Sequence, residues 1–247
     1  MPNHITNELV FECSPERFME IAEFLRGDNK DEPLGHVDFN TLIPMPKELN
    51  IEAGSSGERG YAAYVSFVHI TEGLDPQSIA NAEAKCKAKL NDPESWDLGK
   101  KYYDNLKKYG AKTWYEWSYD NWGTKWNAYD CDRIDTDRQM LAFFTAWCSV
   151  PKIISKISER FPDVTVRYGW ADEDIGSNVG RAVFKGGNMI DTYVPADGSI
   201  EAYRLSADIY GVSLDELGFV PSKDGSSYEY RMPDGVEEHP IPSGEER

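Results

Sequence analysis

The spacing of apolar and polar positions predicts a strand followed by a helix at the start of the chain. Residues 4–12 are rich in β-forming side chains and are typical of a strand. Ser14 then suits a helix cap and Pro15 the first helical position. Apolar residues recur at helical spacing until Gly27, at Phe18, Ile21, Ala22 and Leu25.

The next eighty residues predict an irregular segment and then inserted helices. Residues 28–60 carry prolines and glycines and predict loops, including a flexible one at Gly54–Gly57. Residues 61–70 fit either a short strand or a short helix. A weak helical stripe then predicts a surface helical pair over about 75–110, with a break at Asn91–Pro93.

Residues 113–131 are the most aromatic stretch of the chain. Their closely spaced aromatic side chains favour strands, and residues 120–123 suit a tight turn between them. Residues 139–147 predict another strand, and a helix follows from Val150–Pro151 to about Arg160. Four of the seven tryptophans lie in the aromatic stretch, at positions 114, 117, 122 and 126.

The order of these elements predicts an α+β fold. Residues 164–170 alternate apolar and polar positions as a strand does, and residues 180–184 and 189–194 predict a hairpin around Gly186–Gly187. The resulting β-α-β-β-α-β order is that of a ferredoxin-like sandwich, with a helical insert and an extra hairpin. Helices would cover one face of an antiparallel sheet, and the other face would be solvated, covered by the insert or used for binding.

Charge divides the chain unevenly. The net charge of the 247 residues is −17, and the last 52 residues carry twelve acidic and four basic side chains. We therefore predict one domain over residues 1–220 and an acidic Gly/Ser/Pro-rich tail over 221–247, loosely ordered or free. A negative surface repels phosphates, which disfavours general binding of double-stranded nucleic acid.

Location and redox chemistry follow from what the sequence lacks. No run approaches 18 apolar residues and the start has no signal-peptide pattern, so we expect a cytoplasmic protein without a membrane span. Free thiols are then expected. The four cysteines are Cys13, Cys86, Cys131 and Cys148, and we expect Cys148 to be a small core residue.

The sequence shows few of the residue groupings that form catalytic, metal or cofactor sites. The cysteines and histidines are scattered, and the chain has no glycine-rich phosphate loop and no serine-hydrolase elbow. We therefore expect no metal, no cofactor and no enzymatic activity. Asp130, Asp132, Asp135 and Asp137 form an acidic run that Asp172–Asp174 could complete as a cation or acid/base site. A solvated loop is the favoured interpretation of that run.

The aromatic segment around Lys125 is the candidate binding platform. The residues concerned are Trp122, Lys125, Trp126, Asn127 and Tyr129. They could form a stacking surface on the open sheet face, as in single-stranded nucleic-acid binders. Alternatively, the tryptophans fill the core, Gly123 makes a turn and Lys125 lies at the surface. The structural interpretation is favoured, and the acidity of the chain supports it.

Several stretches resemble the YubB-type ferredoxin-like family of uncharacterised plasmid and phage proteins. The matching stretches include residues 1–7, residues 38–46, the Trp-Gly-Thr-Lys-Trp segment 121–128, and the junction from Phe144 to Pro151. The resemblance spans about residues 1–195. It implies a ferredoxin-like domain in an accessory protein of a mobile element, and it carries no established activity or catalytic residues.

Two hypotheses about function follow. The first is a non-enzymatic cytoplasmic accessory protein of a phage or plasmid that binds a protein partner, in a counter-defence or DNA-mimic role. The alternative is a protein that binds single-stranded nucleic acid or a nucleotide through an aromatic sheet face. A metal-dependent hydrolase using the two acidic runs is a third, weaker hypothesis.

Overall fold

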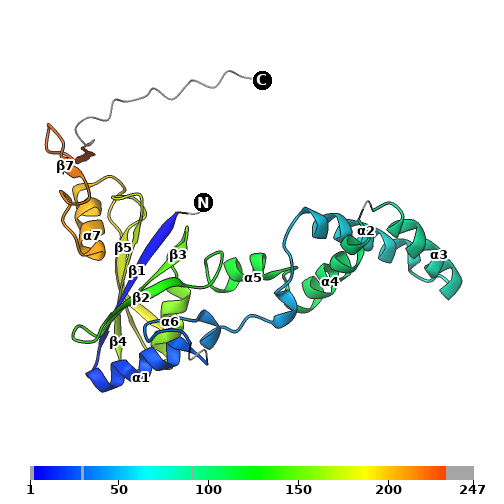
Figure 1. The fold of residues 1–247 in the computed structure, drawn as a ribbon, viewed down its shortest axis with the longest axis horizontal. Helices are drawn as coiled ribbons and strands as arrows, with labels where there is room; N and C mark the ends of the chain where they lie inside the picture. Colours follow the sequence, from blue (N-terminus) through cyan, green and yellow to red (C-terminus); the bar gives the residue numbers. More distant parts are fainter. Residues whose placement is uncertain (1–2, 29–30, 91, 232–247) are drawn as a thin grey trace.

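A six-stranded antiparallel sheet forms the centre of the fold, shown in Figure 1 as a computed structural model that describes residues 3–28, 31–90 and 92–231. The strand order is β2-β3-β1-β4-β5-β6. Strands β1 to β4 follow the ferredoxin-like order, and the hairpin β5–β6 extends the sheet beyond β4. The strands are β1 (His4–Glu12), β2 (Tyr129–Asp135), β3 (Met140–Ala146), β4 (Thr165–Asp172), β5 (Gly180–Lys185) and β6 (Asn188–Tyr193).

Helices α1 (Pro15–Arg26) and α6 (Pro151–Arg160) cover one face of the sheet, as the sequence predicts. Both begin with proline at the first turn, and Ser14 Oγ caps α1 by accepting a hydrogen bond from Arg17 N. Their apolar stripes pack on the odd-numbered side chains of β1, including Leu9 and Phe11. The ferredoxin-like prediction is therefore confirmed in both topology and layering.

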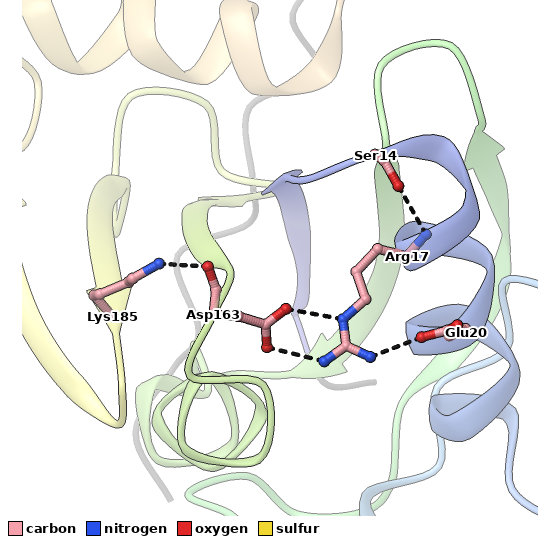
Figure 2. A network of polar contacts seen from close by, with 5 residues as sticks. All are labelled: Ser14, Arg17, Glu20, Asp163 and Lys185. Carbon is pink, nitrogen blue, oxygen red and sulfur yellow. Dashed lines mark hydrogen bonds and ion pairs between the residues drawn. The ribbon is translucent and has the colours of Figure 1, made fainter.

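A surface network fastens α1 to the start of β4 (Figure 2). The Arg17 guanidinium donates two hydrogen bonds to the Asp163 carboxylate, at 3.0 and 2.9 Å, and a third to Glu20 at 2.7 Å. Lys185 at the end of β5 donates to the Asp163 carbonyl at 2.6 Å. Arg17 lowers the pKa of Asp163, as expected for a two-pronged ion pair.

Helix α7 (Ile200–Tyr210) covers part of the opposite face of the sheet (Figure 1). Ile209 packs on the backbone of β4 where Gly169 has no side chain, and a Cβ at that glycine would lie 3.2 Å from Ile209 Cγ1. Ala171 and Ile209 belong to a small second core beneath this helix. Thus part of the second face is covered by a C-terminal helix.

A three-helix arm, defined here as α2 (Ser55–Thr71), α3 (Pro76–Lys87) and α4 (Glu94–Tyr109), projects away from the sheet (Figure 1). The predicted pair around the Asn91–Pro93 break corresponds to α3 and α4. The predicted loop at Gly54–Gly57 is wrong, because α2 begins at Ser55 with Gly54 as its cap. Helices α2 and α4 cross where Gly60 meets Gly99, backbone against backbone.

The strands predicted in the aromatic segment before β2 are also wrong. Helix α5 (Trp114–Asn121) occupies most of it. Thr113 and Glu116 form a capping box, which starts a helix at a point where the aromatic pattern alone favours a strand. The helical spacing places Trp117 and the following Trp122 in the core. Short 3-10 turns, η1 (Phe39–Thr41) and η2 (Lys47–Leu49), lie in the predicted irregular segment.

The C-terminal part is more ordered than predicted as far as it is described. Strands β7 (Phe219–Pro221) and β8 (Tyr228–Tyr230) pair as a hairpin. Tyr203 of α7 contacts the Phe219 ring with centroids 5.3 Å apart, which holds the hairpin against α7. The first part of the predicted tail is therefore structured, and residues 232–247 lie outside the described residues. In the described ranges, no helix has the length and apolar character needed to cross a membrane.

Candidate functional site

Trp122 of the predicted platform belongs to the protein core. Only 3% of its surface is exposed, and its ring contacts Trp117 and Phe39 in T-shaped pairs with centroids 5.3 and 5.8 Å apart. Its indole N–H donates to the Ile43 carbonyl at 2.9 Å. Because both its ring and its polar atom are satisfied inside the fold, Trp122 cannot offer a stacking surface.

Asn127 holds the chain together locally. Its Nδ2 donates to Asp38 Oδ1 at 2.6 Å, and its Oδ1 accepts from the backbone N–H groups of Phe39 and Ala128, both at 2.9 Å. These bonds tie the segment after α1 to the start of β2. Asn127 therefore has a structural role. The sequence predicted it as a platform residue because it directly follows Lys125 and Trp126.

Lys125 and Trp126 contribute to a surface cluster, the Trp147 patch, defined as Tyr115, Lys125, Trp126 and Trp147. Lys125 Nζ lies 4.7 Å from the ring centre of Trp126, 4.8 Å from that of Trp147 and 5.9 Å from that of Tyr115. Tyr115 and Trp147 are 39% and 38% exposed, whereas Lys125 and Trp126 are half-buried. Within the described residues Lys125 makes no ion pair, so these aromatic faces are the contacts of its ammonium group.

Trp147 is held outward by an unfavourable backbone conformation. Its φ is +62°, in the left-handed region that a bulky side chain rarely adopts. Its N–H donates to the Asn3 carbonyl at 2.9 Å. Asn178, itself at φ +43°, donates through Nδ2 to the Trp147 carbonyl at 3.5 Å. The strain at Trp147 is thus supported by two chain segments distant in sequence.

Asp172 organises the segments that hold Trp147. This carboxylate is 6% exposed and accepts three hydrogen bonds, at 3.1, 3.0 and 3.1 Å, from Asn3 Nδ2, Asp174 N and Asn178 Nδ2. The sequence placed Asp172 in an acidic run suited to cations. The structure instead shows a carboxylate whose lone pairs are used inside the protein.

Tyr129, the last platform residue, lies beside the Trp147 patch. Its hydroxyl shares a 2.7 Å hydrogen bond with His4 Nδ1, and its ring contacts those of Trp126 and Phe144. Burial, followed by the charges of Asp130 and Glu173, raises the pKa of Tyr129 to about 12. The tyrosine is therefore a neutral, hydrogen-bonded ring, and the charges around it are negative.

The acidic run at 130–137 is not the solvated loop that the sequence favours. Residues up to Asp135 form strand β2 at the edge of the sheet, and Asp135 closes the turn into β3 by accepting from Asp137 N and Arg138 N. Throughout the described part of the chain, no group of three or more acidic, histidine or cysteine side chains is arranged to hold a metal ion. Cys148 is half-buried rather than part of the core, and burial raises its thiol pKa.

Two members of the cluster, Tyr115 and Trp147, are not predicted by the sequence pattern. Trp147 follows an apolar strand and reads as its last residue, and Tyr115 lies in a segment predicted to be a strand. The cluster forms because α5 is a helix and because the backbone turns into the left-handed region at Trp147, just after β3. The sequence signal that could have indicated this site is Trp147 itself. An aromatic residue just beyond the end of a buried strand lies in a connecting segment, where its side chain can face solvent.

Part of the chain matches a known family model. Residues 125–213, just over a third of the chain, match the family model described as a ferredoxin-like domain in Api92-like protein. No curated protein matches the sequence. A solved structure, protein api92 from Yersinia pseudotuberculosis, aligns with 80% of this chain and 99% of its own, at 10% identity and a TM-score of 0.36. The part of the chain from Lys125 to Ser213 is thus similar to the ferredoxin-like domain of Api92-like proteins.

Proposed function

We propose that the protein is a non-enzymatic accessory protein that binds a protein partner through the Trp147 patch. The observation that carries this proposal is Trp147 itself, a solvent-exposed tryptophan held at φ +62°. Backbone strain of this kind costs about 1–3 kcal/mol and recurs at ligand-contacting sites. The matched family model is described by a domain type and names no reaction.

The chemistry of the patch resembles the energetic centre of protein interfaces. Tryptophan and tyrosine dominate such centres because they bury a large rigid area at low entropic cost. Trp147 and Tyr115 both lie near the Lys125 ammonium group, and each is more than a third exposed. A partner that covers them removes two large rings from water and loses little side-chain freedom.

The surrounding charge favours a basic protein partner over nucleic acid. Asp130 and Glu173 act on Tyr129 beside the patch, and Asp172 is linked to the Trp147 carbonyl through Asn178. Lys125, the one cation among the four residues of the patch, attracts a negative group at the centre, whereas these carboxylates repel phosphates and attract lysine or arginine side chains at the rim. We therefore propose a partner surface with an aliphatic or aromatic centre and a basic rim, which fits a counter-defence role against a basic host protein.

Site-specific crosslinking tests this proposal. A photoreactive phenylalanine analogue placed at Tyr115 should capture one major protein from host extract. Substitution Trp147→Ala should weaken partner binding, and with it capture, by about 30-fold or more, since loss of a hot-spot tryptophan costs about 2 kcal/mol or more. Tyr230→Ala is the matched control, because Tyr230 is a 56% exposed aromatic on the β7–β8 hairpin.

Two results would contradict the proposal. One is capture of the same protein with equal yield by the Trp147→Ala variant. The other is a quenched tryptophan signal on titration with single-stranded oligonucleotide at low salt, abolished in Trp147→Ala, which would assign the patch to nucleic acid instead.

A further inference from the structure

A concave site lies on the opposite side of the sheet from α1 and α6. This β1–α7 cleft, defined here by Glu8, Arg138, Arg167, Arg181, Leu205 and Ile209, has a volume of about 460 Å³. Its floor is the exposed face of β1, β4 and β5, and α7 forms one wall. The volume falls within the range of small-molecule sites.

The register of the sheet places the charged side chains of the cleft in one row. Glu8 pairs with Gly169 and Gly169 with Arg181, so these three residues face the same side of the sheet. Arg181 is two strands from Glu8, about 10 Å between Cα atoms at the usual strand spacing. Ile209 packs over the glycine between them and forms an apolar part of the floor, and Arg138 reaches the cleft from the β2–β3 turn.

The polar groups of the cleft are incompletely used by the protein. Among the described residues, the Glu8 carboxylate forms no hydrogen bond or ion pair, although Glu8 is half-buried. Burial raises the Glu8 pKa, and Arg138 and Arg133 only partly oppose this effect. The Arg181 guanidinium stacks over Tyr193 at 5.2 Å, which leaves its N–H groups available at the edge of the plane. Arg167 is paired with Glu12 at 2.6 Å.

The lining selects a ligand that carries both signs of charge. Three arginines are matched by the carboxylates of Glu8, Asp191 and Asp208, so a simple anion or cation would meet repulsion on one side. Leu205 and Ile209, together with Val10 and Val183, supply aliphatic surface. Carboxylates bind best to planar guanidinium groups, and ammonium groups to carboxylates.

We propose that the β1–α7 cleft binds a small dipolar ligand of the α-amino-acid class with an aliphatic side chain. The ligand carboxylate faces Arg138 and Arg181, its ammonium group faces Glu8, and its side chain lies against Leu205 and Ile209. The site is separate from the Trp147 patch and shares no residue with it.

Calorimetry on the full chain with L-leucine as the probe tests the proposal. N-acetyl-leucine lacks the ammonium group and leucinamide lacks the carboxylate, and each should bind about tenfold more weakly than leucine. The dipeptides Leu-Gly and Gly-Leu distinguish the source of the ligand. Tighter binding of leucine indicates a free amino acid, and tighter binding of a dipeptide indicates a peptide end.

Variants connect each charge of the ligand to one residue. Glu8→Gln should lower leucine affinity to that of N-acetyl-leucine, and Arg138→Ala should lower it to that of leucinamide. Glu201→Gln and Arg204→Ala, on the exposed side of α7, are the matched controls and should leave binding unchanged. Arg138 is an exposed turn residue, so its variant keeps the fold and tests the site independently of Glu8.

The proposal is overturned if leucine binds no better than both blocked analogues, or if no heat is observed up to about 10 mM ligand. Equal leucine affinity in wild type, Glu8→Gln and Arg138→Ala would also overturn it, because binding would then occur elsewhere. None of these results depends on the Trp147 patch, so they leave the proposed protein partner unaffected.

Discussion

The crossing of α2 and α4 allows a sharp prediction for Gly60→Ala. A Cβ at Gly60 would lie 1.7 Å from the Ser95 carbonyl oxygen and 2.6 Å from its carbon, both backbone atoms that cannot rotate away. Such contacts need at least 3.0 Å, so the two helices must separate by about 1.3 Å or more at the crossing. We expect this separation to loosen the arm while the sheet stays intact.

The magnitude follows from the ring contacts that the crossing maintains. Tyr64 and Trp96 have centroids 5.3 Å apart, Phe67 and Trp96 5.4 Å, and Tyr64 and Tyr103 5.3 Å. At about 1 kcal/mol per pair, separation costs about 3 kcal/mol. Alanine in place of a helical glycine restores about 1 kcal/mol of helix propensity. The net loss of arm stability is therefore about 2 kcal/mol.

Hydrogen exchange measures this loss locally. Amides of α4 should exchange about 30-fold faster in Gly60→Ala, whereas amides of β1 and β3 should keep their protection. Ser66→Ala, on the exposed side of α2, is the matched control, because it also raises helix propensity and adds no contact at the crossing. Protection of α4 in Gly60→Ala equal to that in Ser66→Ala would refute the steric reasoning.

Three further predictions follow from polar groups. The pKa of Glu8 is raised in the folded protein, so folding favours its protonated form and the wild type loses stability as the pH rises through that pKa. Urea unfolding should therefore show Glu8→Gln to be more stable than the wild type near pH 7. The difference should vanish below the ordinary pKa of 4.5. Asp172→Ala removes an acceptor from three donors and should lower stability by about 2–3 kcal/mol, and a thermal shift matching less than about 1 kcal/mol would contradict that role. Thr113→Ala should cost about 1 kcal/mol and increase amide exchange only in α5, and unchanged exchange there would argue against the capping box.

Local signals in the sequence determined the ferredoxin-like frame. Three elements depend mainly on residues close in sequence and can be predicted without tertiary information. They are the capped helix after Ser14, the helix from Pro151 and the glycine turn at Gly186–Gly187. The same local rules failed between Thr113 and Cys131. There the capping box and the burial of Trp117 and Trp122 outweigh the strand preference of aromatic residues.

The candidate sites were decided only by tertiary structure. Trp122 and Trp147 are equally conspicuous in the sequence, yet one is buried against Phe39 and the other is held in solvent by Asn3 and Asn178. Glu8 and Arg181, 173 positions apart, share one cleft because antiparallel pairing through β4 places them in one row. Composition and periodicity specify which residues can be buried, but the partners of a side chain depend on which distant segments the fold brings beside it.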